Sequence, residues 1–407
     1  MSVTSIALLH YSVPPVVGGV ESVLAQHARL IAGAGHAVRA LAGRGAAWDL
    51  AVALTVVPEL DSRHPRVLAA KAELDAGRVP ADFERLTGEI LVELRRSLDS
   101  VSILIAHNVC SLHKNLALTA AVHRLSQEGR LGRLILWHHD LAWTTPRYRA
   151  ELHAGYPWDL LRTDWGARHV VVSEPRRSEL AALIGLPPEA ITVVPNGVSP
   201  GDFYKLEERT RGLIHALGLD KADPLLLVPV RITPRKNIEL ALRALAALRL
   251  KSPAAMLVVT GPPGPHNPAN QEYFAGLRAL RAELMLGGAA HFLAEHVDHE
   301  LPDAVIADLY RWADALLLPS REEGFGIPLL EAALSRLPAF CSDIPALRDL
   351  GAGQATYFDP DADPSQVAEV ILACLGQDRA YQAARRARKE FSWPAIYANH
   401  LAPLLER

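Results

Sequence analysis

The 407-residue sequence is poor in cysteine, carries a formal net charge of only −3 and has no long apolar run. Its three cysteines, Cys110, Cys341 and Cys374, are too few and too widely spaced for a disulfide framework or a Cys-x-x-Cys metal site. The small net charge excludes a strong field that would attract nucleic acid. Because no run reaches the roughly 18 apolar residues that a membrane-spanning helix needs, we expect no such helix.

The beginning of the sequence also lacks the basic region of a secretory signal, because its first basic residue is Arg29. Since unpaired cysteines suit a reducing compartment, we expect a cytoplasmic protein. Peripheral contact with the inner membrane face stays open, because one helix carries an apolar stripe of Phe83, Leu86, Ile90, Leu94 and Leu98. Acidic residues interrupt the basic face of this helix, which favours a helix packed on its own domain.

The length fits two domains of roughly 200 residues each. Short apolar runs alternate with helical patterns along both halves, which predicts two successive parallel α/β domains. Strands are expected in the first half at 6–10, 36–42, 101–106, 134–137 and 169–172. In the second half they are expected at 225–230, 255–260, 315–318 and 338–342. A cluster of proline, asparagine and glycine at 195–201 predicts the boundary, and ligands are expected at the carboxyl ends of the strands.

The segment 319–334, PSREEGFGIPLLEAAL, directly follows a predicted strand. A proline in this segment suits the first turn of a helix, and Gly324 and Gly326 would expose backbone N–H groups there, where a phosphate binds well. Glu331 would accept hydrogen bonds from a ribose diol, while Glu323 lies in the loop. The plain alternative is a loop acid at Glu323 and a partner of the helix dipole at Glu331.

These residues resemble the Glu-x7-Glu motif of the retaining glycosyltransferases of family 4. Further segments match that family in order: GGVE at 18–21, VVVSEPRRSEL at 170–180, VVPNGV at 193–198, VRITPRKN at 230–237 and FSW at 391–393. The resemblance implies the GT-B fold, with two Rossmann-like parallel-sheet domains facing a central cleft. It assigns residues 1–198 to an acceptor-binding domain, 199–389 to a nucleotide-sugar-binding domain and 390–407 to a C-terminal helix that returns to the first domain.

The resemblance also implies four catalytic residues. Arg231 and Lys236 fall where the family clamps the diphosphate, and two cations suit a leaving group that gains negative charge. Glu323 would orient hydroxyls of the donor sugar, and His139 would lie near the sugar's hydroxymethyl group. A solvated basic loop and a structural histidine are the plain alternatives, and the roles of the neighbouring His107 and His138 stay open.

The donor-binding residues implied by the resemblance comprise loop glycines, backbone donors and one acid. Gly18 and Gly19 would let the first loop approach the β-phosphate and the acceptor without a side chain in the way, although a plain turn is the alternative. The rest of the set combines the clamp with backbone N–H groups beside the sugar and a ribose-binding carboxylate: Arg231, Lys236, Phe325, Gly326, Ile327 and Glu331.

The reaction implied by the resemblance is transfer of a hexose, mannose or glucose, to an acceptor hydroxyl with retention of configuration. The co-substrate would be a nucleotide-diphosphate sugar, GDP-hexose or UDP-hexose, with no cofactor and no metal. The acidic run 359–363 resembles an ordinary loop rather than an Asp-x-Asp metal site. In similar enzymes the acceptor attacks the front face of the sugar, and the leaving phosphate takes its proton while the protein positions both. The acceptor (glycan, small polyol or lipid) and the oligomeric state stay open.

Other interpretations remain at this point. The first loop lacks G-x-G-x-x-G, so a dinucleotide-dependent dehydrogenase is not favoured. A nucleotide-sugar epimerase of the same fold, a phosphorylase and a non-catalytic nucleotide-sugar-binding protein stay as alternatives. Asn237 and Arg336 stand where the family commonly has glycine, and Asp349 where glutamate is usual. These departures leave the nucleotide base and the sugar of the donor open.

Overall fold

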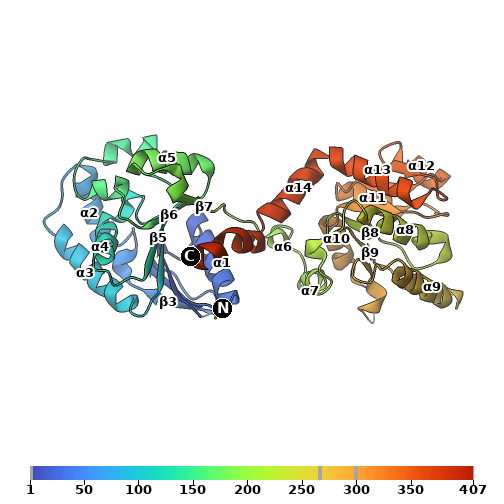
Figure 1. The fold of residues 1–407 in the computed structure, drawn as a ribbon, viewed down its shortest axis with the longest axis horizontal. Helices are drawn as coiled ribbons and strands as arrows, with labels where there is room; N and C mark the ends of the chain where they lie inside the picture. The colour runs from blue at the N-terminus through green and yellow to red at the C-terminus, as the bar shows by residue number, and fades with distance from the viewer. Residues whose placement is uncertain (1–2, 265–267, 298–300, 407) are drawn as a thin grey trace. The chain divides into compact units, whose positions relative to one another are not determined.

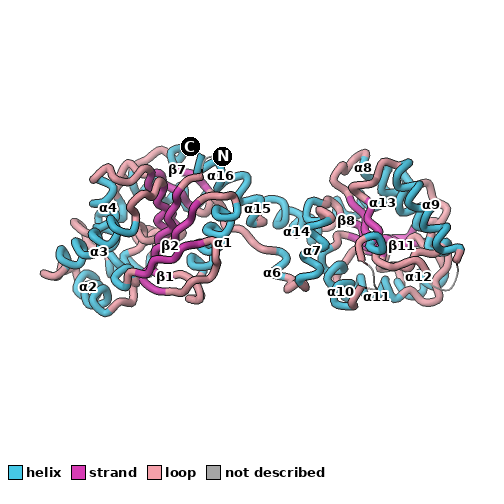
Figure 2. The backbone as a smooth tube through the Cα atoms, turned by 90° about the horizontal axis from the view of Figure 1, so that it is seen from below, coloured by secondary structure: helices cyan, strands magenta, loops and turns pink. Residues whose placement is uncertain are grey.

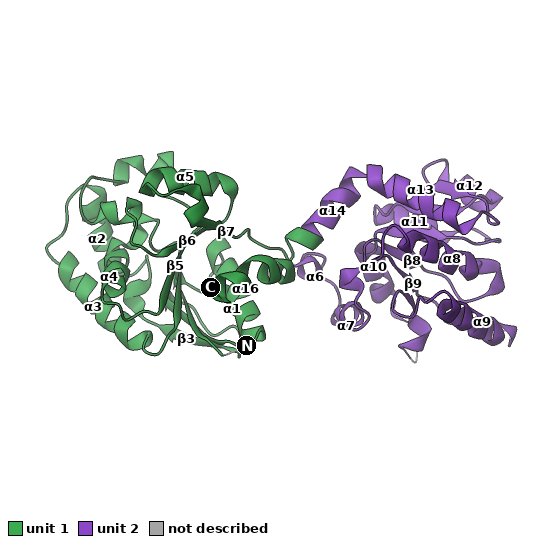
Figure 3. Ribbon diagram, viewed as in Figure 1, with its two compact units in different colours: residues 1–198, 389–407 green, residues 199–388 purple. Residues whose placement is uncertain are grey.

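The computed structural model describes residues 3–264, 268–297 and 301–406. The chain forms two compact units (Figure 1, Figure 3). Unit 1 contains Met1–Val198 together with Lys389–Arg407, and unit 2 contains Ser199–Arg388. Each unit is built around its own parallel sheet.

The sheet of unit 1 has seven parallel strands in the order β3-β2-β1-β4-β5-β6-β7. The strands are β1 Ser5–Ser12, β2 Ala37–Arg44, β3 Val52–Val56, β4 Ile103–His107, β5 Arg133–His138, β6 Arg168–Val171 and β7 Ile191–Val193. The main helices are α1 Gly19–Gly33, α2 Pro65–Asp75, α3 Phe83–Ser97, α4 Leu116–Gln127 and α5 Glu174–Ile184. Because the central strands are buried on both faces, their sequences are almost entirely apolar.

Successive side chains of β1 enter two different cores, as the twofold period of a strand requires. Ala7 and Leu9 pack with apolar residues of α3 and α4. Ile6 and Leu8 pack with residues of α1 and with the C-terminal segment. The apolar stripe of α3 is buried in the first of these cores, which confirms that this helix packs on its own domain.

The end of the chain, Lys389–Arg407, belongs to unit 1. It forms α15 Trp393–Ile396, a π-helical turn Tyr397–Leu401 and α16 Ala402–Glu406. The backbone N–H of Val198 donates to the carbonyl of Phe391 at 2.7 Å. Arg133 donates through Nη1 to the carbonyls of Leu404 and Leu405 at 3.1 and 3.0 Å, so a guanidinium satisfies the last helical turn.

The sheet of unit 2 has six parallel strands in the order β10-β9-β8-β11-β12-β13. Figure 2 colours the strands magenta and labels β8 and β11 of this sheet. The strands are β8 Leu225–Val228, β9 Met256–Val259, β10 Ala290–Phe292, β11 Ala315–Leu318, β12 Ala339–Ser342 and β13 Thr356–Phe358. The helices are α6 Pro200–Phe203, α7 Glu208–Ala216, α8 Ile238–Arg249, α9 Ala269–Glu283, α10 Asp303–Trp312, α11 Ile327–Leu334, α12 Pro345–Gly351, α13 Pro364–Gln377 and α14 Arg379–Glu390. This is the doubly wound order of a Rossmann fold.

The structure contains every strand expected from the sequence and adds four: β3, β7, β10 and β13. All four lie at the edges of their sheets. The strands β7, β10 and β13 have only three residues each, whereas β3 lies in the apolar stretch 51–57, which the expected strands leave out. In the described residues, no helix combines the length and the apolar composition needed to cross a membrane. Both sheets reverse their winding direction beside their first strand, between β1 and β4 and between β8 and β11, and a crevice for a ligand forms at such points.

Candidate functional site

The predicted site residues of unit 2 follow the two strands that flank its winding reversal. The loop after β8 carries Arg231 and Lys236, and the loop after β11 carries Glu323. Since β8 and β11 are parallel neighbours, both loops leave the sheet at its carboxyl edge. The backbone N–H of Arg321 donates to the carbonyl of Arg235 at 2.8 Å, and Arg235 Nη1 donates to the carbonyl of Glu322 at 3.3 Å. The two loops are therefore bonded to each other.

Lys236 and Glu323 form a buried ion pair. The Lys236 Nζ lies 2.5 Å from the Glu323 Oε1, and the two side chains are only 9% and 7% exposed. The Ser320 hydroxyl donates to the same carboxylate oxygen at 2.7 Å. Because charges this far from solvent are stable only when paired and hydrogen-bonded, the three side chains form one unit.

The turn after Lys236 explains one departure from the family pattern. Lys236 ends a 3₁₀ turn over Pro234–Lys236, and Asn237 then adopts a left-handed conformation with φ of +51°. Asparagine is among the few residues other than glycine that tolerate this region. Its side-chain Nδ2 also donates to the carbonyl of Pro360 at 2.9 Å. Asn237 thus replaces the usual glycine and anchors the turn that orients Lys236.

The loop after β11 leads into α11 through Gly326, which has φ of +100°. A Cβ at this position would lie 2.6 Å from the Leu347 Cδ2, so both the backbone conformation and the available space require glycine. The flanking Phe325 and Ile327 are 57% and 59% exposed. Pro328 has no backbone N–H, and the Leu329 N–H donates to the carbonyl of Gly326 at 2.9 Å. The N–H groups that would suit an anionic or oxygen-rich ligand at this helix start are therefore those of Gly326 and Ile327.

Glu331 lies in the second turn of α11, half-buried beside Tyr310 of α10. The Tyr310 hydroxyl donates to the Glu331 Oε2 at 2.6 Å. Burial, and then this bond to a carboxylate, raise the pKa of Tyr310 above its usual value. Tyr310 therefore stays protonated and holds one oxygen of the carboxylate that the sequence assigns to the ribose.

Arg231 is exposed at the start of its loop. Gly261, two residues after β9, passes close to the backbone of this loop: a Cβ at Gly261 would lie 2.7 Å from the Arg231 Cα. This close approach explains the glycine at 261 and fixes the loop backbone from which the guanidinium projects.

The predicted histidine of unit 1 lies at the corresponding edge of the other sheet. His139 directly follows β5, and its Nε2 lies 3.2 Å from the Nδ1 of His107, the last residue of β4. The side-chain Oδ1 of Asn108 accepts from the backbone N–H groups of His139 and Asp140, both at 3.0 Å. Burial lowers the pKa of His139 to about 4, so its ring is neutral at pH 7.

The glycines of the first loop precede and begin α1. Gly18 occupies the N-cap position and Gly19 opens the helix. A Cβ at Gly18 would lie 2.1 Å from the Glu21 Oε2, whereas one at Gly19 would meet nothing within 4 Å. The carboxylate of Glu21 accepts from the Ser12 hydroxyl at 2.7 Å and lies 3.8 Å from the His10 Nε2. Close contact with Glu21 is therefore one physical reason for glycine at position 18.

His138 belongs to a different contact network from His139. Its Nε2 lies 3.0 Å from the Nδ1 of His169, whose Nε2 lies 3.2 Å from the Asp164 Oδ1. Burial lowers the pKa of His138 well below the usual value. The two adjacent histidines thus have separate surroundings, and only His139 contacts His107.

One group of acidic and histidine side chains in the described ranges has a geometry that could hold a metal ion: Asp75, His113 and Glu151. The ammonium group of Lys71 already contacts both of its carboxylates, at 2.5 Å from Asp75 and 2.9 Å from Glu151. A protein cation therefore already pairs with both carboxylates of this group. In the acidic run 359–363, Asp361 instead pairs with Arg321 at 2.6 Å.

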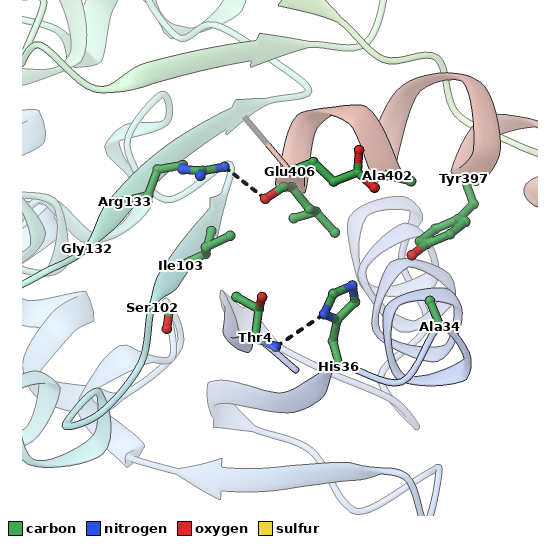
Figure 4. Close-up of a pocket in the computed structure, with 11 residues that line it drawn as sticks. Thr4, Ala34, His36, Ser102, Ile103, Gly132, Arg133, Tyr397, Ala402 and Glu406 are labelled. Carbon is green, nitrogen blue, oxygen red and sulfur yellow. Dashed lines mark hydrogen bonds between the residues drawn. The ribbon is translucent and has the colours of Figure 1, made fainter. Parts of the chain in front are cut away.

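A cavity of 660 Å³ in unit 1 lies at the opposite edge of the sheet (Figure 4). Thr4, Ser102 and Gly132 line it, and they precede β1, β4 and β5. Tyr397 and Glu406 of the C-terminal segment cover it. Since His107 and His139 lie at the carboxyl ends of the same strands, this cavity does not coincide with the predicted site.

Three residues that position the site were not identified from the sequence: Ser320, Tyr310 and Asn108. Ser320 lies two residues after β11 and three before Glu323, a spacing that favours a local contact. Asn108 directly follows β4, where functional residues of parallel sheets gather. Tyr310 lies 21 positions before its partner, and no local signal links the two.

The sequence matches two family profiles that divide the chain nearly as the two units do. The profile described as Glycosyltransferase Family 4 matches residues 17–202, and that described as Glycosyl transferases group 1 matches residues 213–391. Together they take in almost all of both sheets and both sets of predicted site residues.

Individual relatives agree with these profiles. The MMP alpha-(1->4)-mannosyltransferase of Mycolicibacterium hassiacum is 27% identical over 98% of this chain and 97% of its own length. The D-inositol 3-phosphate glycosyltransferase of Kineococcus radiotolerans is 31% identical over 56% of this chain and 54% of its own length, so that match spans about half of the relative. The crystal structure of WaaG, a glycosyltransferase involved in lipopolysaccharide biosynthesis, aligns with 97% of this chain and 99% of its own at 19% identity, with a TM-score of 0.34.

Proposed function

This chain belongs to glycosyltransferase family 4, and we propose that it transfers a hexose from a nucleotide-diphosphate sugar to an acceptor hydroxyl with retention of the anomeric configuration. The observation that carries the proposal is the buried Lys236–Glu323 pair at the carboxyl edge of β8 and β11. An ammonium group beside a carboxylate suits a substrate that is anionic at its phosphates and rich in hydroxyls at its sugar.

The contacts of Glu323 favour front-face attack over double displacement. Its Oε1 accepts from both Lys236 and Ser320, and a carboxylate oxygen neutralised in this way is a weak nucleophile. In our proposal the acceptor oxygen forms the new glycosidic bond as the bond to the diphosphate breaks. The leaving phosphate oxygen takes the acceptor's proton. Glu323 orients sugar hydroxyls, and Arg231 and Lys236 neutralise the diphosphate.

The remaining proposed roles concern the two ends of the donor. Glu331, held by Tyr310, would accept hydrogen bonds from the ribose. The backbone N–H groups of Phe325, Gly326 and Ile327 would donate to the phosphate or the sugar. His139 would bind the transferred sugar, and Gly18 and Gly19 would leave room for the β-phosphate and the acceptor.

We propose GDP-hexose or UDP-hexose as the donor, mannose or glucose as the sugar, and no requirement for a metal. The full-length relative is described as a mannosyltransferase, which supports mannose as the first sugar to test. Other relatives are described as D-inositol 3-phosphate glycosyltransferases, so a phosphorylated polyol is the first acceptor to test. Glycan and lipid acceptors follow, and for the lipid we propose peripheral contact of a cytoplasmic protein with the inner membrane face.

A thermal-shift panel tests the donor assignment directly. The protein is heated with UDP, GDP, ADP and dTDP, and with their glucose and mannose forms, with and without a chelator. We expect one base to raise the Tm selectively, because a ligand that binds only the folded state stabilises it. Proton NMR of the anomeric centre in the product then tests retention. Failure of every nucleotide to stabilise the chain would contradict the assignment of the clamp.

A further inference from the structure

His107 lies behind His139 and has no exposed surface. It is the last residue of β4, and the Trp137 ring stacks on it with a centroid distance of 5.2 Å. The carbonyl of His107 accepts from the Nδ1 of His10 at 2.7 Å, which ties β4 to β1 at this level. The side chain is therefore fixed from several sides and cannot reach a bound ligand itself.

The two nitrogens of the His107 ring have opposite surroundings. The Nδ1 lies 3.2 Å from the His139 Nε2. The Nε2 is buried and has no hydrogen-bond partner in the part of the chain that the structure describes. Burial and the neighbouring histidines lower the pKa of His107 well below its usual value, so the ring is neutral and carries one N–H.

This asymmetry selects one tautomer. A proton on Nε2 would leave a buried N–H without an acceptor, which is unfavourable and rare in folded proteins. A proton on Nδ1 is instead donated to the His139 Nε2. His139 is neutral as well, so once its Nε2 accepts a hydrogen bond its own proton resides on Nδ1.

We propose that His107 is a positioning residue that fixes His139 in the Nδ1–H tautomer, so that His139 can only donate, not accept, through its remaining ring nitrogen. Such a donor selects an oxygen lone pair, as a sugar hydroxyl presents. The assignment of that oxygen to the transferred hexose rests on the proposed function, whereas the tautomer itself does not.

Nitrogen-15 NMR of the ¹⁵N-histidine-labelled full chain tests the tautomer without any substrate. His139→Gln identifies the His139 signals by their loss. We expect pyrrole-type Nδ1 and pyridine-type Nε2 in His139 at pH 7.5. In His107→Leu, which removes the donor and keeps an apolar side chain, we expect this preference to relax. The opposite tautomer of His139 in the native chain, or an unchanged tautomer in His107→Leu, would overturn the proposal.

Kinetics then test the consequence for transfer. We expect His107→Leu to lower kcat by about 10-fold to 100-fold through misorientation of His139, while the Kd of the nucleoside diphosphate stays unchanged. His107→Asn should restore most of the rate, because its amide offers an N–H in place of Nδ1–H. In a His139→Ala background, His107→Leu should cost nothing further.

If His107→Leu lowered kcat in the His139→Ala background as much as it does in the native chain, the proposed positioning role of His107 would be overturned. His123→Leu, a substitution of a half-buried histidine elsewhere in unit 1, is the matched control for the loss of an imidazole. If the native chain transfers no sugar at all, the proposed function fails, while the NMR result still decides the tautomer.

Discussion

The two units share the order of six strands, to which unit 1 adds β7, but they differ in the chemistry of their carboxyl edges. In unit 1, His10 of β1 bonds to the carbonyl of His107 at the end of β4, and the His107 ring bonds to His139, which directly follows β5. Burial keeps all three rings neutral at pH 7. In unit 2 the loops after β8 and β11 carry a buried ammonium–carboxylate pair. Parallel topology thus predicts the edge of each sheet at which a ligand would bind, and the side chains that follow the strands predict which chemical groups each edge would accept.

Among the substitutions that test this difference between the units, we expect removal of Lys236 to have the largest effect on stability and turnover. Lys236→Ala leaves the Glu323 carboxylate buried without its cation, and we expect a loss of about 3–5 kcal/mol in the free energy of unfolding. We also expect kcat to fall by about 100-fold or more, because the variant lacks the charge that we propose to stabilise the leaving group. Urea unfolding and steady-state kinetics measure the two effects.

Lys251→Ala is the matched control for this experiment. Lys251 pairs with Glu369 at 3.2 Å in the same unit, but both side chains are more than half exposed. Water screens such a pair, so this substitution should change stability by less than about 1 kcal/mol. Equal effects of the two substitutions would contradict the importance of burial at the Lys236 site.

The second-largest expected effect is a difference between the two units in their stability at acidic pH. Burial lowers the pKa of His10 and of His139 to about 4 and that of His27 to about 3. Below the unfolded-state histidine pKa of about 6.5, these histidines bind protons in the unfolded chain but stay unprotonated in the folded chain. Stability is therefore complete above pH 6.5 and falls as the pH drops towards 4.

Hydrogen exchange followed by mass spectrometry can assign this acid effect to peptides. Those of β1, β4 and α1 should lose protection between pH 6.5 and 4 before those of β8 and β11. His27→Leu sharpens the test, because both ring nitrogens of His27 are buried and lack a partner in the described chain. This variant should be less acid-sensitive than the native protein. Simultaneous loss of protection in both units would contradict the expectation that unit 1 is the more acid-sensitive of the two.

The proposed contact of Glu331 with the ribose offers a smaller and more local test. Glu331→Ala should weaken binding of the nucleotide sugar, with little effect on the rate at saturation. Tyr310→Phe keeps the ring but removes the hydrogen bond to Glu331, and we expect a Kd about 3-fold to 10-fold higher. Isothermal calorimetry with the stabilising nucleotide sugar measures both. Tyr397→Phe in unit 1 is the control, and wild-type affinity in Glu331→Ala would contradict the assignment.

Sequence motifs identify site residues that stand in local patterns, and they miss residues whose roles depend on contacts between separate elements. Lys236 and Glu323 stand in local patterns after strands, so the sequence predicts both, and the structure places them in contact. Contacts between separate elements leave no such pattern: Tyr310 reaches Glu331 from another helix, and His107 reaches His139 from the neighbouring strand. The strand β13 is missed for a related reason, since three residues at an edge carry too few apolar side chains to stand out.

The smallest expected effect is at the turn of Asn237, where two substitutions at one position can be compared. At φ of +51°, glycine would relieve the residual strain but lose the hydrogen bond from Nδ2 to Pro360, so Asn237→Gly should be nearly neutral in stability. Asn237→Ala loses the bond and keeps a Cβ, and should cost about 1–2 kcal/mol. Thermal unfolding of both variants measures the difference. Because the turn orients Lys236, Asn237→Ala should also lower kcat more than Asn237→Gly does. Equal turnover in the two variants would mean that the ion pair with Glu323 holds Lys236 in place without help from the turn.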